Sequence, residues 1–280
     1  MVTHAGAARL LPSRRYLYCW SVEHERGTRL DIDGGLAVLT IHRPQVRNAI
    51  NVATMHELHE QLDAIEAADV HVLVVTGAGD TAFVSGGDLK ELAALRTVEA
   101  AQEMAITMRQ VLDRIASLPI PVVAAMNGDA YGGGAEFSVA CDMRIAADDV
   151  KIVFNQVRLG VMPAWGGIER LADIVGPSRA MYLMTTGEVI TAAHAQAWGL
   201  FERVVPRAEF ELVWRSLARS MAEVPRASLA GIKQVLRTHR PAVHPAMMQE
   251  ATRLFANTWV ADDHWRMVEE MDAKRKAAKR

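Results

Sequence analysis

The chain has 280 residues, half of them hydrophobic, and its 31 basic and 33 acidic side chains leave a formal net charge of −2. A chain of this length can bury a large core, either as one large domain or as a domain with a smaller appendage. The near balance of charge argues against nucleic-acid and membrane partners, so small-molecule chemistry is the better starting hypothesis.

The targeting and redox signals favour a protein of the cytoplasm. Cys19 and Cys141 are too few and too far apart for a disulfide framework or a cysteine metal site, which indicates a reducing compartment. No apolar run reaches the roughly 18 residues of a membrane span, and the opening segment lacks a signal-peptide core. Residues 1–22 contain arginines and no acidic residue, so they weakly resemble an import peptide, but a plain N-terminal extension is favoured.

Strands and helices alternate along the first two thirds of the chain. The run "LAVLTI" (36–41) predicts a strand, and apolar residues spaced three and four apart predict an amphipathic helix over 51–68. A buried strand over 70–76, a helix over about 99–117 and a strand over 122–126 follow. This order predicts an α/β protein whose parallel strands are covered by helices.

After Pro206 the composition changes to helix formers, which predicts a helical C-terminal portion. It ends in "EEMDAKRKAAKR", for which a solvated helix is the plain interpretation and a phosphate-binding edge the sharper one. On the earlier helix, His56 and His59 lack an HExxH pattern and are expected to be solvated.

Two glycine loops carry the chemistry that the sequence predicts. Gly132 to Gly134 precede "AEFSVACD", and if a helix begins there their amides lie at a helix N-terminus, which favours an oxyanion. Ser85 to Asp88 likewise stand between a strand and a helix and offer a second amide. Tight turns explain most glycine triplets, but two convergent donors make an oxyanion hole. Neither loop has the pattern of a phosphate loop or a dinucleotide site.

The segments "FVSGGDLKEL", "IPVVAAMNGDAYGGGAEFSVACDMRIA" and "RLGVMPAWGGIERL" together resemble the crotonase superfamily, the enoyl-CoA hydratase/isomerase family, over roughly residues 23–276. The resemblance implies a ClpP/crotonase-like spiral of ββα units in residues 23–206, followed by a helical region, 207–280, that mediates trimer formation. Two trimers often stack as a hexamer. It also implies an acyl-CoA substrate that carries its own coenzyme A, with no separate cofactor and no metal.

In this resemblance the amides of Gly87 and Gly133 polarise the thioester carbonyl and stabilise its enolate. Glu136 falls on the family's first catalytic glutamate, where a raised pKa would suit proton transfer. A helix N-terminal acid that only stabilises the helix dipole is the alternative.

Gln156 stands where hydratases of this family generally carry a second glutamate. An amide cannot act as a general base, although it can donate a hydrogen bond to water or to a substrate carboxylate. Decarboxylation or isomerisation is therefore favoured over standard hydration, and "KIVFNQ" and "GVMPAWGG" also resemble the ethylmalonyl- and methylmalonyl-CoA decarboxylase branch. A single-glutamate hydratase and a non-catalytic CoA-thioester-binding protein remain the alternatives.

Four further residues are candidates for substrate binding. Lys90, Phe255 and Lys274 match family positions near the nucleotide part of coenzyme A, the last two often beside a neighbouring subunit's site. Trp165 either closes the acyl pocket or serves as a packing or oligomer contact.

Overall fold

The larger of two β-sheets forms the centre of the computed structural model, which describes residues 26–238 and 245–278. Its strand order is β1-β2-β3-β5-β7-β10. β1 runs antiparallel to β2, and every other pair in this sheet is parallel. The strands are β1 (Thr28–Asp33), β2 (Leu36–Ile41), β3 (Val72–Gly77), β5 (Val122–Met126), β7 (Met143–Ala147) and β10 (Arg203–Val205).

The three predicted strands are the central ones of this sheet. β2 and β5 have the predicted bounds, and β3 is shifted by one or two residues from the predicted range 70–76. All three are almost completely buried, as parallel strands covered on both faces are. Their continuous apolar runs made them visible in the sequence.

A smaller sheet, which the sequence did not reveal, stands beside the first. Its order is β4-β6-β8-β9, and its strands have only two or three residues, too few for an alternating pattern to be recognised. The strands are β4 (Ala82–Val84), β6 (Asp129–Tyr131), β8 (Lys151–Val153) and β9 (Ile190–Thr191). β6 stands between the predicted strand 122–126 and the glycine triplet, so the triplet does not follow that strand directly.

The chain moves repeatedly from one sheet to the other. β3, β5 and β7 of the larger sheet are each followed by a strand of the smaller sheet, β4, β6 or β8, and then by a helical segment. The predicted α/β spiral of ββα units is therefore confirmed. The helical segments of this part are η1 (Pro44–Val46), α1 (Val52–Ala67), α2 (Leu89–Leu92), α3 (Val98–Ser117), α4 (Gly133–Ala140), η2 (Gln156–Leu159), α5 (Gly167–Val175), α6 (Pro177–Thr186) and α7 (Ala192–Ala197).

The two long helices α1 and α3 begin at side-chain caps. The side-chain oxygen of Asn51 accepts a hydrogen bond from Thr54 N at 2.9 Å, and that of Thr97 accepts one from Ala100 N at 3.2 Å. Each cap satisfies a backbone donor that the first helical turn leaves unpaired. On α1, His56 is exposed as predicted, whereas His59 is half-buried and contacts Arg114.

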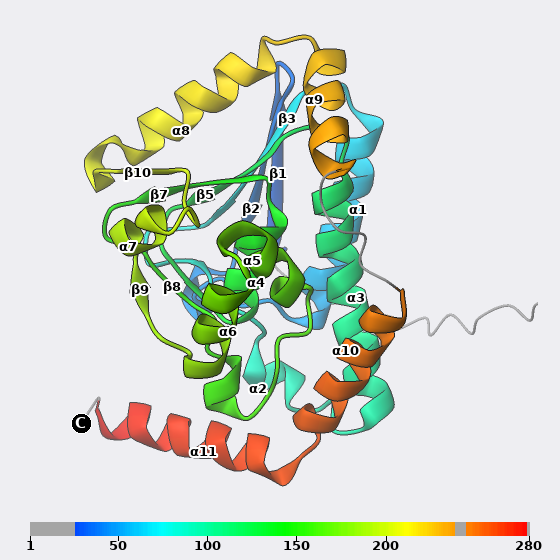
Figure 1. Ribbon diagram of the computed structural model, residues 1–280, viewed down its shortest axis with the longest axis vertical. Helices are drawn as coiled ribbons and strands as arrows, with labels where there is room; N and C mark the ends of the chain where they lie inside the picture. The colour runs from blue at the N-terminus through cyan, green and yellow to red at the C-terminus, as the bar shows by residue number, and fades with distance from the viewer. Residues whose placement is uncertain (1–25, 239–244, 279–280) are drawn as a thin grey trace, which may run out of the picture.

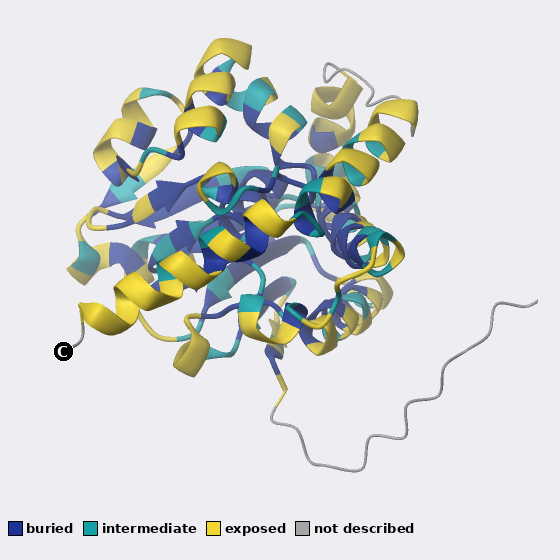
Figure 2. Ribbon diagram, turned by 90° about the horizontal axis from the view of Figure 1, so that it is seen from below, coloured by how far each residue is buried: buried dark blue, intermediate teal, exposed yellow. Residues whose placement is uncertain are grey.

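Four helices form the described part of the C-terminal portion, which confirms the predicted helical region. They are α8 (Arg207–Ala222), α9 (Arg226–Thr238), α10 (Pro245–Trp259) and α11 (Asp262–Ala277). α10 packs along α3, and α11 crosses the end of the molecule next to η2 (Figure 1). The first half of α11 is partly buried and its charged second half is exposed (Figure 2).

A buried lysine attaches α9 to the larger sheet. Lys233 Nζ donates to Ile120 O at 2.8 Å and pairs with Asp142 Oδ2 at 2.6 Å. The same carboxylate oxygen accepts from Val122 N at 2.8 Å, at the start of β5. Burial lowers the pKa of Lys233, while the Asp142 charge opposes that change.

Some predictions fall on residues that the structure does not describe. The N-terminal extension, 1–22, and Cys19 lie outside the described ranges, and the division at residues 22 and 206 stays a prediction. Cys141 is buried behind α4, where burial raises the pKa of its thiol to about 12. No helix in the described part of the chain is long and apolar enough to span a bilayer.

Candidate active site

The two glycine loops lie side by side at one end of the smaller sheet. β4 and β6 are parallel neighbours, so the loops that leave their carboxyl ends meet. Gly86 has φ +97°, and a Cβ there would lie 3.1 Å from Tyr131 O and 3.3 Å from Gly133 N. Only glycine combines this backbone conformation with so close an approach. The predicted juxtaposition of the loops is therefore present.

Each loop contains a glycine amide that the backbone of the described residues leaves available as a donor. Ile50 N donates to Gly86 O, and Asp88 N donates to Ile50 O, both at 2.8 Å, so the residues on either side of Gly87 are held. Within the described chain, the amide of Gly87 itself has no acceptor. Gly133 begins α4, where backbone N–H groups lack intrahelical acceptors. Both glycines line one cavity, as the donors of an oxyanion hole must.

Glu136 lies one turn into α4 and is almost completely buried, with 2% of its surface exposed. Gln156 Nε2 donates to its Oε1 at 2.8 Å, and the amides of Trp165 and Gly167 donate to its Oε2 at 2.8 and 2.9 Å. Burial raises the pKa of Glu136 to about 7, although these three donors work in the opposite direction. None of the donors belongs to α4, so the carboxyl is held by other segments instead of capping its own helix.

Gln156, in η2, faces this carboxyl directly. Its amide nitrogen donates to Glu136, while its Oε1 is buried and has no partner within the described residues. The sequence suggested that this amide donates to a substrate carboxylate. Its nitrogen carries two N–H groups, so one can hold Glu136 while the other stays available for that role. The unpaired atom is an acceptor, which suits a water or hydroxyl donor.

The guanidinium of Arg170 holds the segment from Trp165 to Gly167 in place. Arg170 Nη1 donates to Trp165 O at 2.9 Å, and its Nη2 pairs with Asp113 on α3. A Cβ on Gly166, where φ is +88°, would lie 2.3 Å from Arg170 Nη1. A buried Arg170 therefore fixes the backbone segment whose two amides donate to Glu136. The sequence carried no signal for this arrangement, because Asp113, which pairs with Arg170, lies on α3, 57 residues earlier in the chain.

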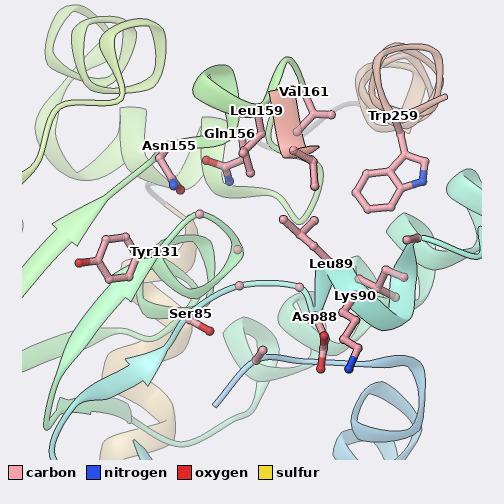
Figure 3. Close-up of a pocket in the computed structure, with 18 of the residues that line it drawn as sticks. Ser85, Asp88, Leu89, Lys90, Tyr131, Asn155, Gln156, Leu159, Val161 and Trp259 are labelled. Carbon is pink, nitrogen blue, oxygen red and sulfur yellow. The ribbon is translucent and has the colours of Figure 1, made fainter. Parts of the chain in front are cut away.

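A cavity of about 690 Å³ opens from these groups, a volume typical of small-molecule sites. In Figure 3 Gln156 and Trp259 lie on opposite sides of it, with Leu89, Leu159 and Val161 drawn between them. Its apolar wall comes from several elements and includes Met104, Val161, Phe255, Trp259, Trp265 and Val268. Basic side chains also line it: Arg47, Lys90, Arg96 and Arg275.

The structure brings together seven of the eight predicted site residues. Those that line the cavity are Gly87, Lys90, Gly133, Glu136, Gln156, Trp165 and Phe255. Lys274 is exposed on α11 and does not line it, whereas its neighbour Arg275 does. Sequence reasoning missed Arg47, Arg96 and Arg275, because isolated basic residues far apart in the chain form no motif.

Comparison with known proteins identifies relatives of this site and fold. The family model described as "Enoyl-CoA hydratase/isomerase" matches residues 31–278. A short-chain-enoyl-CoA hydratase of Clostridium acetobutylicum is 34% identical over 74% of this chain and 79% of that relative. A crotonyl-CoA hydratase of Syntrophomonas wolfei is 40% identical over 63% of this chain and 68% of that relative.

A solved structure shows the same fold. The enoyl-CoA hydratase/isomerase from Mycobacterium paratuberculosis superposes with a TM-score of 0.81 at 25% identity. The superposition covers 89% of this chain and all of that one. The resemblance found in the glycine loops thus extends over the described fold.

Proposed function

The chain belongs to the enoyl-CoA hydratase/isomerase family, and we propose that it processes an acyl-CoA through a thioester enolate with Glu136 as its one acid/base. In this proposal the amides of Gly87 and Gly133 bind the thioester oxygen. Donors aimed at an oxygen that becomes negative stabilise the transition state more than the ground state. Both glycines bear catalytic amides on this assignment.

The observation that carries the proposal is the state of Glu136. Its carboxyl is buried beside the two glycine loops, and its pKa of about 7 makes both protonation states available near neutral pH. A group of this kind can remove a proton from one carbon of an acyl chain and return it to another. The reaction this supports is proton transfer, as in the movement of a double bond.

The neighbour of Glu136 supports a one-carboxylate mechanism. Gln156 cannot take up a proton, and its amide nitrogen holds the catalytic carboxyl instead. Isomerisation and decarboxylation are therefore both favoured over standard hydration, and the second N–H of Gln156 can serve as a donor to a substrate carboxylate. In either reaction Gln156 positions Glu136.

Hydration is the second candidate, and the unpaired side-chain oxygen of Gln156 supports it. The buried Oε1 of Gln156 lacks a partner within the described chain and can accept a hydrogen bond from water. Glu136 would then act alone on that water. Both relatives described above, from Clostridium acetobutylicum and Syntrophomonas wolfei, are named as hydratases, which supports this candidate.

The coenzyme A part of the substrate would lie along the basic side chains of the cavity. Arg47 lines the cavity from the end of η1, Lys90 from α2 and Arg275 from α11. Phe255 would contribute an aromatic face to coenzyme A. Lys274 is exposed next to Arg275 in the chain and would bind a phosphate group of coenzyme A. No separate cofactor and no metal enter this proposal.

Assembly and location are part of the same proposal. Apolar side chains of α9 are exposed, among them Ile232, Val235 and Leu236, at 61–63% of their surface, which supports burial against other copies in a homotrimer or hexamer. Sedimentation analysis tests this assembly, and a monomer at micromolar concentration would contradict it. The cytoplasmic location rests on the sequence alone.

A mass-spectrometric assay tests the proposed function. The purified protein is incubated in D₂O with crotonyl-CoA, a 3-enoyl-CoA, methylmalonyl-CoA and ethylmalonyl-CoA. A shifted double bond with deuterium on carbon indicates isomerisation, loss of carbon dioxide indicates decarboxylation, and gain of water indicates hydration. Binding of thioesters without any turnover would instead support a non-catalytic CoA-binding protein.

Two variants test the residue assignment in that assay. Glu136→Gln keeps the shape of the side chain but removes the titrating group, and we expect a loss of at least ~10²-fold in rate. Glu209→Gln, on the exposed side of α8, is the matched control and keeps the activity of the unmodified protein. Full turnover by Glu136→Gln would overturn the catalytic assignment.

A further inference from the structure

The indole of Trp165 fills the space beside both glycines of the proposed oxyanion hole. A Cβ on Gly133 would lie 2.1 Å from Trp165 Cζ3, and one on Gly87 would lie 3.9 Å from Trp165 Cζ2. The six-membered ring of the indole therefore borders both glycines. Its side chain is well packed, because Trp165 has only 5% of its surface exposed.

The main chain of Trp165 holds this ring in place. Its amide donates to Glu136 Oε2 at 2.8 Å, and its carbonyl accepts from Arg170 Nη1 at 2.9 Å. Arg170 is itself buried and paired with Asp113. The backbone of Trp165 cannot move away without breaking its bond to the catalytic carboxyl. The indole is thus a fixed wall of the cavity.

A wall at this place restricts one part of an acyl group. The indole lies on the side of Gly133 and Gly87 where a Cβ would point, and the backbone amide of the same Trp165 donates to Glu136. When a thioester carbonyl binds the amides of the two glycines, its α-carbon therefore lies between Glu136 and the indole. The remainder of the chain extends along the apolar side of the cavity. The ring therefore restricts the size of substituents on the α-carbon more strongly than it restricts the length of the acyl chain.

We propose that Trp165 selects acyl-CoA thioesters that carry no branch on the carbon next to the carbonyl. This inference rests on the proposed function, and it names the substrate class of the same site. An added methyl group against a packed ring forces the ring or the substrate out of position. The selection favours isomerisation of straight-chain enoyl thioesters over decarboxylation of 2-alkylmalonyl thioesters.

Calorimetric binding of butyryl-CoA and isobutyryl-CoA tests the selection. The two ligands are isomers that differ in the position of one methyl group, which lies on the α-carbon in isobutyryl-CoA and at the end of the chain in butyryl-CoA. Both are saturated, so the readout does not depend on turnover. We expect the unmodified protein to bind butyryl-CoA at least ~10-fold more tightly, the lower end of what one methylene contributes in a shaped pocket. In Trp165→Leu the ratio falls to within about 2-fold, mainly through tighter binding of isobutyryl-CoA.

Two further variants keep the result interpretable. Trp165→Phe retains an aromatic ring of smaller size and gives an intermediate ratio, which provides a readout if the leucine variant does not fold. Trp198→Leu removes an indole that lies outside the cavity, in edge-to-face contact with His194, and retains the ratio of the unmodified protein.

The outcomes separate the inference from the proposed function. Equal binding of both thioesters by the unmodified protein, or an unchanged ratio in a folded Trp165 variant, overturns the selection. Tight, selective binding without turnover of any unsaturated or malonyl thioester overturns the proposed function and leaves the selection standing. Failure to bind any thioester overturns both.

Discussion

Replacing Glu136 by glutamine should make the protein more stable, and more so as the pH rises. Burial raises the pKa of this carboxyl from 4.5 to about 7, so the folded protein binds the proton more tightly than the unfolded chain does. Stability therefore falls as the pH rises from 4.5 through 7 and stays low above that range. Glutamine carries no charge and escapes this effect.

The size of the effect follows from the two pKa values. Each pKa unit corresponds to about 1.36 kcal/mol, so ionising the buried carboxyl at pH 8 costs about 3 kcal/mol, whereas at pH 5 the cost is only about 1 kcal/mol. The site can accommodate the glutamine at position 136. The side-chain amide of Gln156 can rotate so that its unpaired Oε1 accepts a hydrogen bond from the new amide nitrogen. The stability advantage of Glu136→Gln should thus grow by about 2 kcal/mol between these pH values.

Urea denaturation of both proteins at pH 5 and pH 8 measures this difference. All other titrating groups are common to the two proteins and cancel in the comparison. Glu209→Gln controls for the loss of one carboxyl and should show no such pH-dependent gain. An advantage of Glu136→Gln that is the same at both pH values would refute the argument that burial sets the protonation of Glu136.

Three other perturbations have defined outcomes. Gly133→Ala puts a methyl group against the Trp165 ring, so we expect a cost of about 1–3 kcal/mol in unfolding free energy and about 10²- to 10³-fold in kcat/KM. Adding Trp165→Leu should recover most of the lost stability, and purely additive costs would contradict this. Lys233→Met leaves Asp142 without its buried partner and should cost about 3–5 kcal/mol in urea denaturation; a loss below about 1 kcal/mol would contradict a tightly coupled pair. Gln156→Glu places a second carboxyl against the catalytic one, which raises the pKa of the pair, so the acidic limb of the kcat/KM profile should move to higher pH. An unmoved limb would show that the two side chains do not interact in solution.

Part of the fold could be predicted because its signals are local. β2, β3 and β5 are long, completely covered strands, so each appears as a continuous apolar run. The smaller sheet could not be predicted, because strands of two or three residues form through pairing with distant segments. Because the smaller sheet was not predicted, its strand β6, which positions the glycine triplet, was not predicted either.

For the site, the sequence by itself determined which residues are available and what each can do chemically. Glycines at Gly87 and Gly133, a carboxyl at Glu136 and an amide at Gln156 follow from the chain and from its resemblance to a family, and the structure brings all four to one cavity.

Only the tertiary structure decided how those groups act on one another. It turned the nitrogen of Gln156 toward Glu136, raised the pKa of that carboxyl to about 7, and set the Trp165 indole beside both glycines. Hydrogen-bond direction, burial and van der Waals contact depend on segments that are far apart in the chain. A local pattern records what a side chain can donate or accept, but not which partner the fold places within 3 Å of it.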